Sequence, residues 1–147
     1  MDFDIKVGTK SERRIKVSHN QTTSFLWEGE NVFSTPSMIS EMEETCRLLL
    51  KEQFLKVDSE WDSVGTVVDI NHTAATPVGA DIILKAEITG VDGRRVRFKV
   101  STEDNLEQIG EGTHERFIIN IPKFKEKFDL KVKKLDEGQK GLERNKS

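Results

Sequence analysis

The 147-residue sequence contains a single cysteine, three prolines and no tyrosine. One cysteine, Cys46, cannot build an internal disulfide framework or a multi-cysteine metal site, which favours the cytoplasm as the setting. No apolar run approaches the ~18 residues that a membrane-spanning helix needs. The first residues also lack the basic start and apolar stretch of a signal peptide. These absences predict one soluble domain that is large enough to bury a core.

Several catalytic signatures are missing as well. The sequence has no Gly-x-Ser-x-Gly nucleophile elbow, no phosphate-binding Gly-x-x-x-x-Gly-Lys loop, no dinucleotide fingerprint and no His-Glu-x-x-His metal motif. We therefore expect neither a catalytic metal nor a resident cofactor.

Charge is distributed unevenly along the chain. Lys123 to Ser147 holds nine Lys/Arg and five Asp/Glu, a net charge of +4, so residues 1–122 carry −7 of the total of −3. A basic tail could touch nucleic acid or an anionic cofactor, but chain ends are more often solvated and frayed. We expect a basic, partly disordered tail over residues 126–147, and no nucleic-acid or membrane partner.

The period from Pro36 to about Phe54 predicts a helix. At 100° per residue, its apolar side chains share an arc of roughly 160°. Pro36 suits the first helical position, and the Thr35 hydroxyl could cap the exposed amides. Glu43 falls inside the apolar arc, where a carboxylate is costly unless it is paired, protonated or used in chemistry. The alternative is a carboxylate at the rim of the core. The arc consists of Met38, Ile39, Met42, Cys46, Leu49, Leu50 and Phe54.

After the helix the period changes to 2, which predicts four antiparallel strands. Asp92-Gly93 is a type I′ hairpin dipeptide between two of them. A sheet with one apolar face needs a cover, and this helix is the only element of sufficient size. The prediction is an α+β domain whose sheet curls around one helix, following an irregular segment, residues 1–12. The strands expected are residues 13–19 and 22–27 before the helix, and 63–74, 81–89, 95–102 and 109–121 after it.

Some polar residues and one glycine in these strands could carry chemistry. His72 belongs to a predicted face of alternate residues that runs from Val64 to Ala74. A histidine there could move a proton near neutral pH or simply be a core residue. Gly65 lets a ligand approach the backbone or marks a bulge. Arg116 could pair with a phosphate or carboxylate, or stay solvated. His19 and His114 have no comparable setting, and we expect Cys46 to be buried and inert.

Ordered segments carry a recognisable pattern through most of the chain. In this order and spacing they resemble the hot-dog-fold thioesterases similar to fluoroacetyl-CoA thioesterase, over residues 13–125. The segments are Val32-Phe33-Ser34-Thr35-Pro36-Ser37-Met38-Ile39, Met42-Glu43, Ser63-Val64-Gly65-Thr66, Ile70-x-His72-x-Ala74-x-Thr76-Pro77-x-Gly79, Val91-x-Gly93-Arg94-Arg95, Phe98-x-Val100 and Ile109-Gly110-x-Gly112-Thr113-His114-Glu115-Arg116.

The resemblance implies a hot-dog fold, a homodimer joined edge to edge, and an acyl-CoA site near the subunit interface. It assigns catalytic roles to Thr35, Glu43 and His72, and substrate contacts to Gly65 and Arg116. The implied reaction is hydrolysis of a small acyl-CoA thioester to the free acid and CoA, with Glu43 as nucleophile or as the base that activates water.

Two other functions are compatible with this fold. A hot-dog protein could bind acyl-CoA without hydrolysing it, or act as a dehydratase or hydratase on carbons beside the thioester. The acyl group also stays open, because the loop Glu28-Gly29-Glu30-Asn31 ahead of the first motif is polar rather than aromatic.

Overall fold

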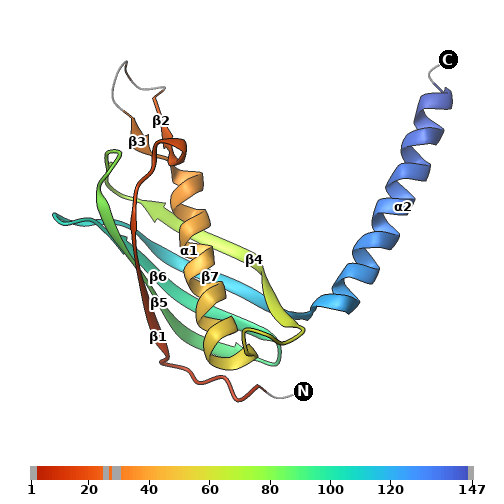
Figure 1. The fold of residues 1–147 in the computed structure, drawn as a ribbon, viewed down its shortest axis with the longest axis horizontal. Coiled ribbons are helices and arrows are strands. Elements are labelled where there is room, and N and C mark those ends of the chain that lie inside the picture. The colour runs from red at the N-terminus through yellow and green to blue at the C-terminus, as the bar shows by residue number, and fades with distance from the viewer. Residues whose placement is uncertain (1–2, 25–26, 28–30, 146–147) are drawn as a thin grey trace.

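The computed structural model describes residues 3–24, 27 and 31–145. Figure 1 shows α1 lying against one face of the main sheet, while α2 projects away from the domain. In chain order the elements are β1 (Lys10–Lys16), β2 (Thr22–Thr23), β3 (Val32–Phe33), α1 (Thr35–Leu50), β4 (Trp61–His72), β5 (Asp81–Asp92), β6 (Arg95–Glu103), β7 (Gln108–Asn120) and α2 (Ile121–Asn145).

The main sheet is antiparallel, with the strand order β1-β5-β6-β7-β4. Alternate residues of β5 and β6 are buried together with one face of α1, as the period of 2 predicts. The predicted α+β domain with a sheet curled around one helix is confirmed. Among the described residues, β7 is the strand that pairs with β4, on one side, so β4 forms an edge of the sheet.

Helix α1 begins with a cap that differs from the predicted one. Ser34 is the N-cap, and its Oγ accepts a hydrogen bond from the Ser37 amide at 3.2 Å. Thr35 is the first helical residue and Pro36 the second. The prediction of Thr35 as the cap is therefore wrong. Because the serine already satisfies this amide, the threonine hydroxyl is left for another partner.

The buried face of α1 matches most of the predicted arc, but Glu43 lies at its margin. Met38, Met42 and Cys46 are buried, whereas the Glu43 side chain is 39% exposed. The helical wheel predicted that Glu43 faces the core, whereas the structure has it at the rim of the core, as the alternative prediction stated. The helix then continues as a π-helical turn over Lys51–Leu55.

A β-bulge between Gly65 and Val67 changes which side chains of β4 face the helix. Gly65 pairs with Arg116 and Val67 with Glu115, so Thr66 is an extra residue in β4. The predicted single face from Val64 onward is therefore wrong for the first part of the strand. The extra residue reverses the alternation, which puts Gly65 before the bulge and His72 after it on the same face.

Two shorter predictions also need correction. The β5–β6 loop consists of Gly93 and Arg94, and only the glycine has a positive φ, of +61°. That pattern is typical of a type II′ turn rather than type I′. β1 begins at Lys10, inside the segment expected to be irregular. The predicted strand over 22–27 is limited to Thr22–Thr23 among its described residues, and residues 25–26 lie outside the described part.

The C-terminal segment is a helix rather than a partly disordered tail. α2 runs over Ile121–Asn145, and its first amide donates to the Glu60 carbonyl at 2.8 Å. Its apolar residues recur at helical spacing, a signal that the density of lysines obscured. Within the described residues, neither α2 nor α1 is long and apolar enough to cross a bilayer.

Candidate functional site

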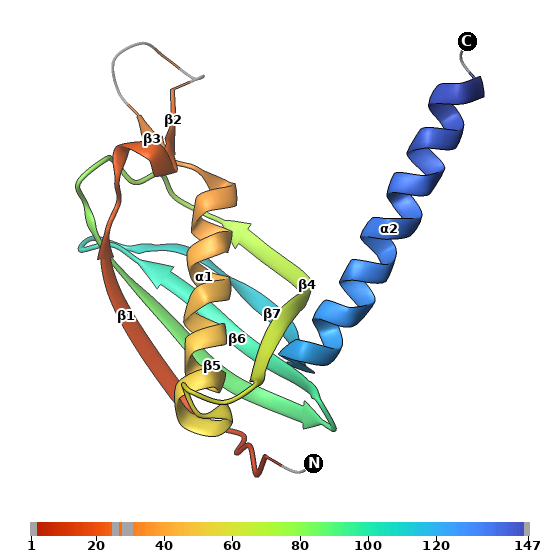
Figure 2. The same ribbon diagram turned by 45° about the vertical axis from the view of Figure 1, so that its right-hand side comes forward.

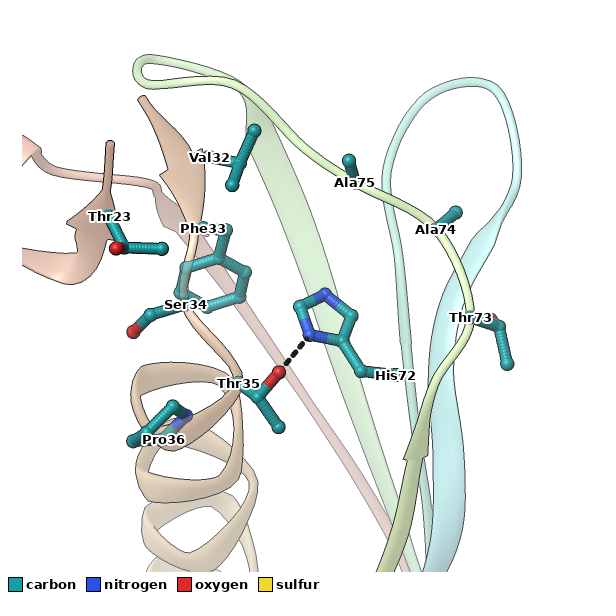
Figure 3. A pocket seen from close by; sticks show the side chains of 10 residues that line it. All are labelled: Thr23, Val32, Phe33, Ser34, Thr35, Pro36, His72, Thr73, Ala74 and Ala75. Carbon is teal, nitrogen blue, oxygen red and sulfur yellow. Dashed lines mark hydrogen bonds between the residues drawn. The ribbon is translucent and has the colours of Figure 1, made fainter. Parts of the chain in front are cut away.

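Thr35 and His72 meet at one end of the sheet. Thr35 opens α1 and His72 is the last residue of β4. The Thr35 Oγ1 and His72 Nδ1 atoms are 2.8 Å apart, a hydrogen bond, and Figure 3 shows the two side chains pointing toward one another. We call these residues the threonine–histidine pair. The sequence singled out both residues, and the structure brings them into contact.

The threonine–histidine pair borders a pocket of about 610 Å³. Its walls come from the start of α1, from β3 and from the segment after β4, as Figure 3 shows. Most wall residues present carbon, so the pocket suits a small apolar group next to a few polar atoms. The lining residues are Thr23, Val32, Phe33, Ser34, Thr35, Pro36, His72, Thr73, Ala74 and Ala75.

The surroundings of His72 favour a neutral imidazole. Burial lowers the pKa of His72 from its ordinary 6.5, and a backbone hydrogen bond at Ala74 opposes this effect only in part. The ring nitrogen Nε2 is buried and has no hydrogen-bond partner among the described residues. A Thr35 hydroxyl that donates to Nδ1 would leave the ring proton on Nε2, which could donate a hydrogen bond to a reacting group.

Glu43 lies in a second group of polar residues. Its carboxylate oxygen Oε2 is 3.8 Å from the Arg116 guanidinium, which is buried. Gly65 lies against both: a Cβ on this glycine would come within 3.1 Å of Glu43 Oε2 and 3.4 Å of the Arg116 guanidinium. We call Glu43, Gly65, Arg116, Ser63 and His114 the glutamate–arginine cluster. The sequence singled out the first three of these residues.

Ser63 and His114 hold the Arg116 side chain in place. The guanidinium donates to Ser63 Oγ and to the Ser63 carbonyl, both at 2.7 Å. Burial lowers the pKa of Arg116, although nearby acidic groups including Glu43 oppose it. A buried cation needs such partners, since an unpaired charge in a protein interior is strongly destabilising.

His114 belongs to this cluster, although the sequence analysis set it aside. It is buried, its ring stacks on Phe98, and its Nδ1 is 2.7 Å from the Val67 carbonyl. A proton on Nδ1 satisfies that carbonyl, so Nε2 can accept from the Arg116 guanidinium 3.2 Å away. The available signal was parity: two residues apart on one strand, His114 and Arg116 share a face.

Cys46 takes no part in hydrogen bonding in the described structure. It is buried, and burial raises the pKa of its thiol to about 12. A thiol with such a pKa is a poor nucleophile at neutral pH, as expected for a core cysteine. Among the described residues, no three His, Cys, Asp or Glu side chains gather as a metal site would require.

The threonine–histidine pair and the glutamate–arginine cluster are separate within one chain. Thr35 and Glu43 are eight residues apart on α1, a rise of about 12 Å. Gly65 and His72 are seven residues apart on β4, or about 23 Å along an extended strand. The structure thus brings the five predicted site residues into two groups rather than one.

The lowered pKa values of His72 and His114 predict a pH-dependent stability. Burial lowers the pKa of both His72 and His114 below 6.5. As the pH falls below about 6.5, the unfolded chain binds more protons than the folded chain, so the free energy of unfolding should decrease. The decrease should continue until the folded-state pKa values are reached. Thermal unfolding measured between pH 8 and pH 5 tests this.

A matched pair of variants assigns the effect. His114→Phe keeps a flat ring against Phe98 but cannot titrate. The slope of its unfolding free energy against pH should therefore be smaller than that of the parent, by the equivalent of up to about one bound proton. His19→Gln, which removes an exposed histidine, is the matched control. A His114→Phe slope equal to that of the parent protein would contradict this account.

Comparisons with known proteins identify the family to which the chain belongs. The family model described as fluoroacetyl-CoA-specific thioesterase matches residues 17–122. The fluoroacetyl-CoA thioesterase of Streptantibioticus cattleyicolor is 33% identical over 139 residues, which cover 90% of this chain and 98% of that protein.

Solved structures show the same relationship. A structure of a fluoroacetyl-CoA thioesterase superposes with a TM-score of 0.77 at 33% identity, covering 86% of this chain and 97% of the other. A Thermus thermophilus protein of the thioesterase superfamily superposes with a TM-score of 0.80 at 22% identity, covering 90% and 97%, and supports the hot-dog fold. The chain is a hot-dog-fold thioester hydrolase and belongs to the fluoroacetyl-CoA-specific thioesterase family.

Proposed function

We propose that the chain hydrolyses a small acyl-CoA thioester at a site that two copies of the chain complete together. The observation that carries the proposal is the Thr35–His72 hydrogen bond of 2.8 Å at the border of a largely apolar pocket. The pocket would take the acyl group. A fluoroacetyl-CoA thioesterase variant has been solved with fluoroacetate and CoA, with a TM-score of 0.73 and 33% identity; CoA is the proposed thiol here.

The open edge of β4 supports a homodimer. The middle of this strand, from Gly65 to Asp69, is exposed, including Val67 and Val68 at 47% and 42%. A long, apolar, unpaired edge is a surface on which another strand can pair. Val68 lies about halfway between Gly65 and His72. Antiparallel pairing of two β4 strands about an axis near Val68 would place His72 of one copy close to Gly65 of the other.

This pairing would join the threonine–histidine pair of one copy to the glutamate–arginine cluster of the other. The Glu43 carboxylate would then attack the thioester carbonyl, or remove a proton from an attacking water. The C–S bond breaks and CoA leaves as a thiolate, to which the Nε2–H of the neutral His72 would donate a hydrogen bond. The proton that water gives up during hydrolysis then neutralises the thiolate. Water completes the acyl-glutamate route, so both routes consume one water and yield the acid and CoA.

Gly65 and Arg116 would support this reaction without reacting themselves. The missing side chain of Gly65 leaves room for the carbonyl oxygen, which its amide could help to hold. Arg116 would orient the Glu43 carboxylate through their contact at 3.8 Å. A thiolate is a good leaving group, so the proposed chemistry requires no cofactor beyond CoA. The cytoplasm is the proposed setting, on the basis of the single cysteine.

Release of free thiol from a panel of short, branched and aromatic acyl-CoAs tests the activity. We expect release from at least one small acyl-CoA, and a fall of about 10²-fold or more in kcat for Glu43→Ala, because the attacking group is lost. Glu44→Ala is the control, since this neighbouring carboxylate pairs with Arg47 at 2.7 Å instead. No release from the whole panel would reject hydrolysis and leave an acyl-CoA-binding protein or a hydratase.

Gly65→Ala tests the space beside Glu43. The added Cβ would lie 3.1 Å from Glu43 Oε2 and from His114 Cε1, which displaces the carboxylate or fills the space for the carbonyl. We expect kcat to fall by ~10²-fold with the fold retained. Gly90→Ala in β5 is the control, because the atom nearest to the added Cβ would belong to the flexible Arg97 side chain at 3.7 Å, an ordinary contact. Parental kcat in Gly65→Ala would remove Gly65 from the site.

Heterodimers of two inactive variants test whether the site is shared. Glu43→Ala and His72→Ala chains carrying different tags would be co-expressed, and the doubly tagged dimer purified. One of its two sites would have every residue intact, so about half of the parental activity should return. The Thr35→Ala/His72→Ala heterodimer is the control and should stay inactive, because both of its sites are damaged. An inactive Glu43→Ala/His72→Ala heterodimer would place the whole site within one chain.

A further inference from the structure

An exposed apolar stripe runs along α2. At 100° per residue, its five members fall within an arc of roughly 80°. Their exposed fractions lie between 42% and 61%, so each is open to solvent in the single chain. In proteins, a helix gains most of its stability from packing such an apolar face against another part of the structure. The stripe consists of Ile121, Phe124, Phe128, Val132 and Leu135.

The stripe is flanked by lysines on one side. Lys127, Lys131 and Lys134 form a row along this flank and line a shallow hollow with Leu130 and Leu135. Residues 123–147 carry a net charge of +4, whereas the rest of the chain carries −7. α2 therefore presents an apolar face bordered by positive charge. A partner surface that carries negative charge is its electrostatic complement.

The position of α2 points to a second copy of this chain as that surface. Its first turn is tied to the segment before β4 by the hydrogen bond from the Ile121 amide to Glu60. From there α2 extends on the side of the molecule where β4 is the open edge, as Figures 1 and 2 agree. A second copy paired along β4 would occupy that side. A helix of 25 residues, about 37 Å long, spans the width of a small domain.

We propose that α2 packs its apolar stripe against the second copy in the dimer, with the lysine row facing that copy's acidic surface. The second copy also has exposed apolar side chains next to its β4 edge, such as Val67 and Phe117. These side chains enlarge the surface that α2 of the first copy can cover. This inference rests on the β4-paired dimer proposed above and adds a second contact to it. In the proposed dimer, α2 of each copy thus packs on the hot-dog domain of the other copy.

Variants of the 147-residue chain with added carboxylates test the contact. Phe124→Glu/Phe128→Glu places two carboxylates in the stripe, whereas Leu130→Glu places one on the opposite face of α2, where Leu130 is 58% exposed. Sedimentation equilibrium over a dilution series gives the dimer dissociation constant. We expect it to rise at least about tenfold in the double variant, as for loss of buried aromatic anchors, and to stay at the parental value in Leu130→Glu.

A second variant examines the lysine row separately. Lys127→Glu/Lys131→Glu/Lys134→Glu should also weaken the dimer, and added salt should weaken the parental dimer more than this variant. Circular dichroism at room temperature should show the parental content of helix and strand in every variant, because the substituted side chains are exposed in the single chain.

Several outcomes would overturn the inference. A double variant that dimerises like the parent, or a Leu130→Glu variant that is weakened equally, would remove the stripe from the interface. A monomeric parent would do the same. In another outcome, the parent protein binds vesicles of phosphatidylserine and phosphatidylcholine through the stripe while the substitutions leave the dimer dissociation constant unchanged. That result would assign the stripe to a membrane surface. Thiol release by the parent remains the separate test of the proposed function.

Discussion

The extra residue in β4 is the constraint on which the arrangement of the site depends. Because the strand gains one residue between Gly65 and Val67, the side-chain alternation reverses there. Gly65 consequently faces α1 on one side of the bulge, and His72 faces α1 on the other. In a regular strand one of these two positions would face away from the helix. A local irregularity thus allows a single strand to serve both polar groups.

A buried arginine organises the second group. Arg116 would be costly in the interior without partners, and Ser63 supplies two acceptors while His114 supplies a third. The Glu43 carboxylate is the remaining partner and is held less closely, at 3.8 Å, with its side chain 39% exposed. A carboxylate that is oriented by a cation but still open on one side suits a group that must meet a substrate.

The single chain leaves several surfaces uncovered, and they lie on the same side of the molecule. The β4 edge is unpaired, Val67 and Val68 are exposed, and α2 extends beyond that edge with its apolar stripe open. The proposed site is also incomplete within one chain, because the threonine–histidine pair lies apart from the glutamate–arginine cluster. Pairing with a second copy would address all of them, which is why the proposed function and the proposed role of α2 converge on one dimer.

The sequence by itself determined the class of fold and the residues of interest. The change of period from 3.6 to 2 gave the long helix followed by antiparallel strands, and the ordered motifs led to the thioesterase family. These signals are local, because amphipathic periodicity and motif spacing are properties of neighbouring residues. The sequence also singled out Thr35 and His72, but their contact came from the tertiary structure.

Only the tertiary structure decided how these residues are grouped. A helical wheel cannot distinguish the core from its rim, so it placed Glu43 too deep. Periodicity cannot reveal a bulge, so it assigned Val64 to the wrong face of β4. His114 became noticeable only once Arg116 and the Val67 carbonyl were brought to its two ring nitrogens. Such relations join residues far apart in the chain, and they depend on the register of strand pairing, which single-residue patterns do not contain.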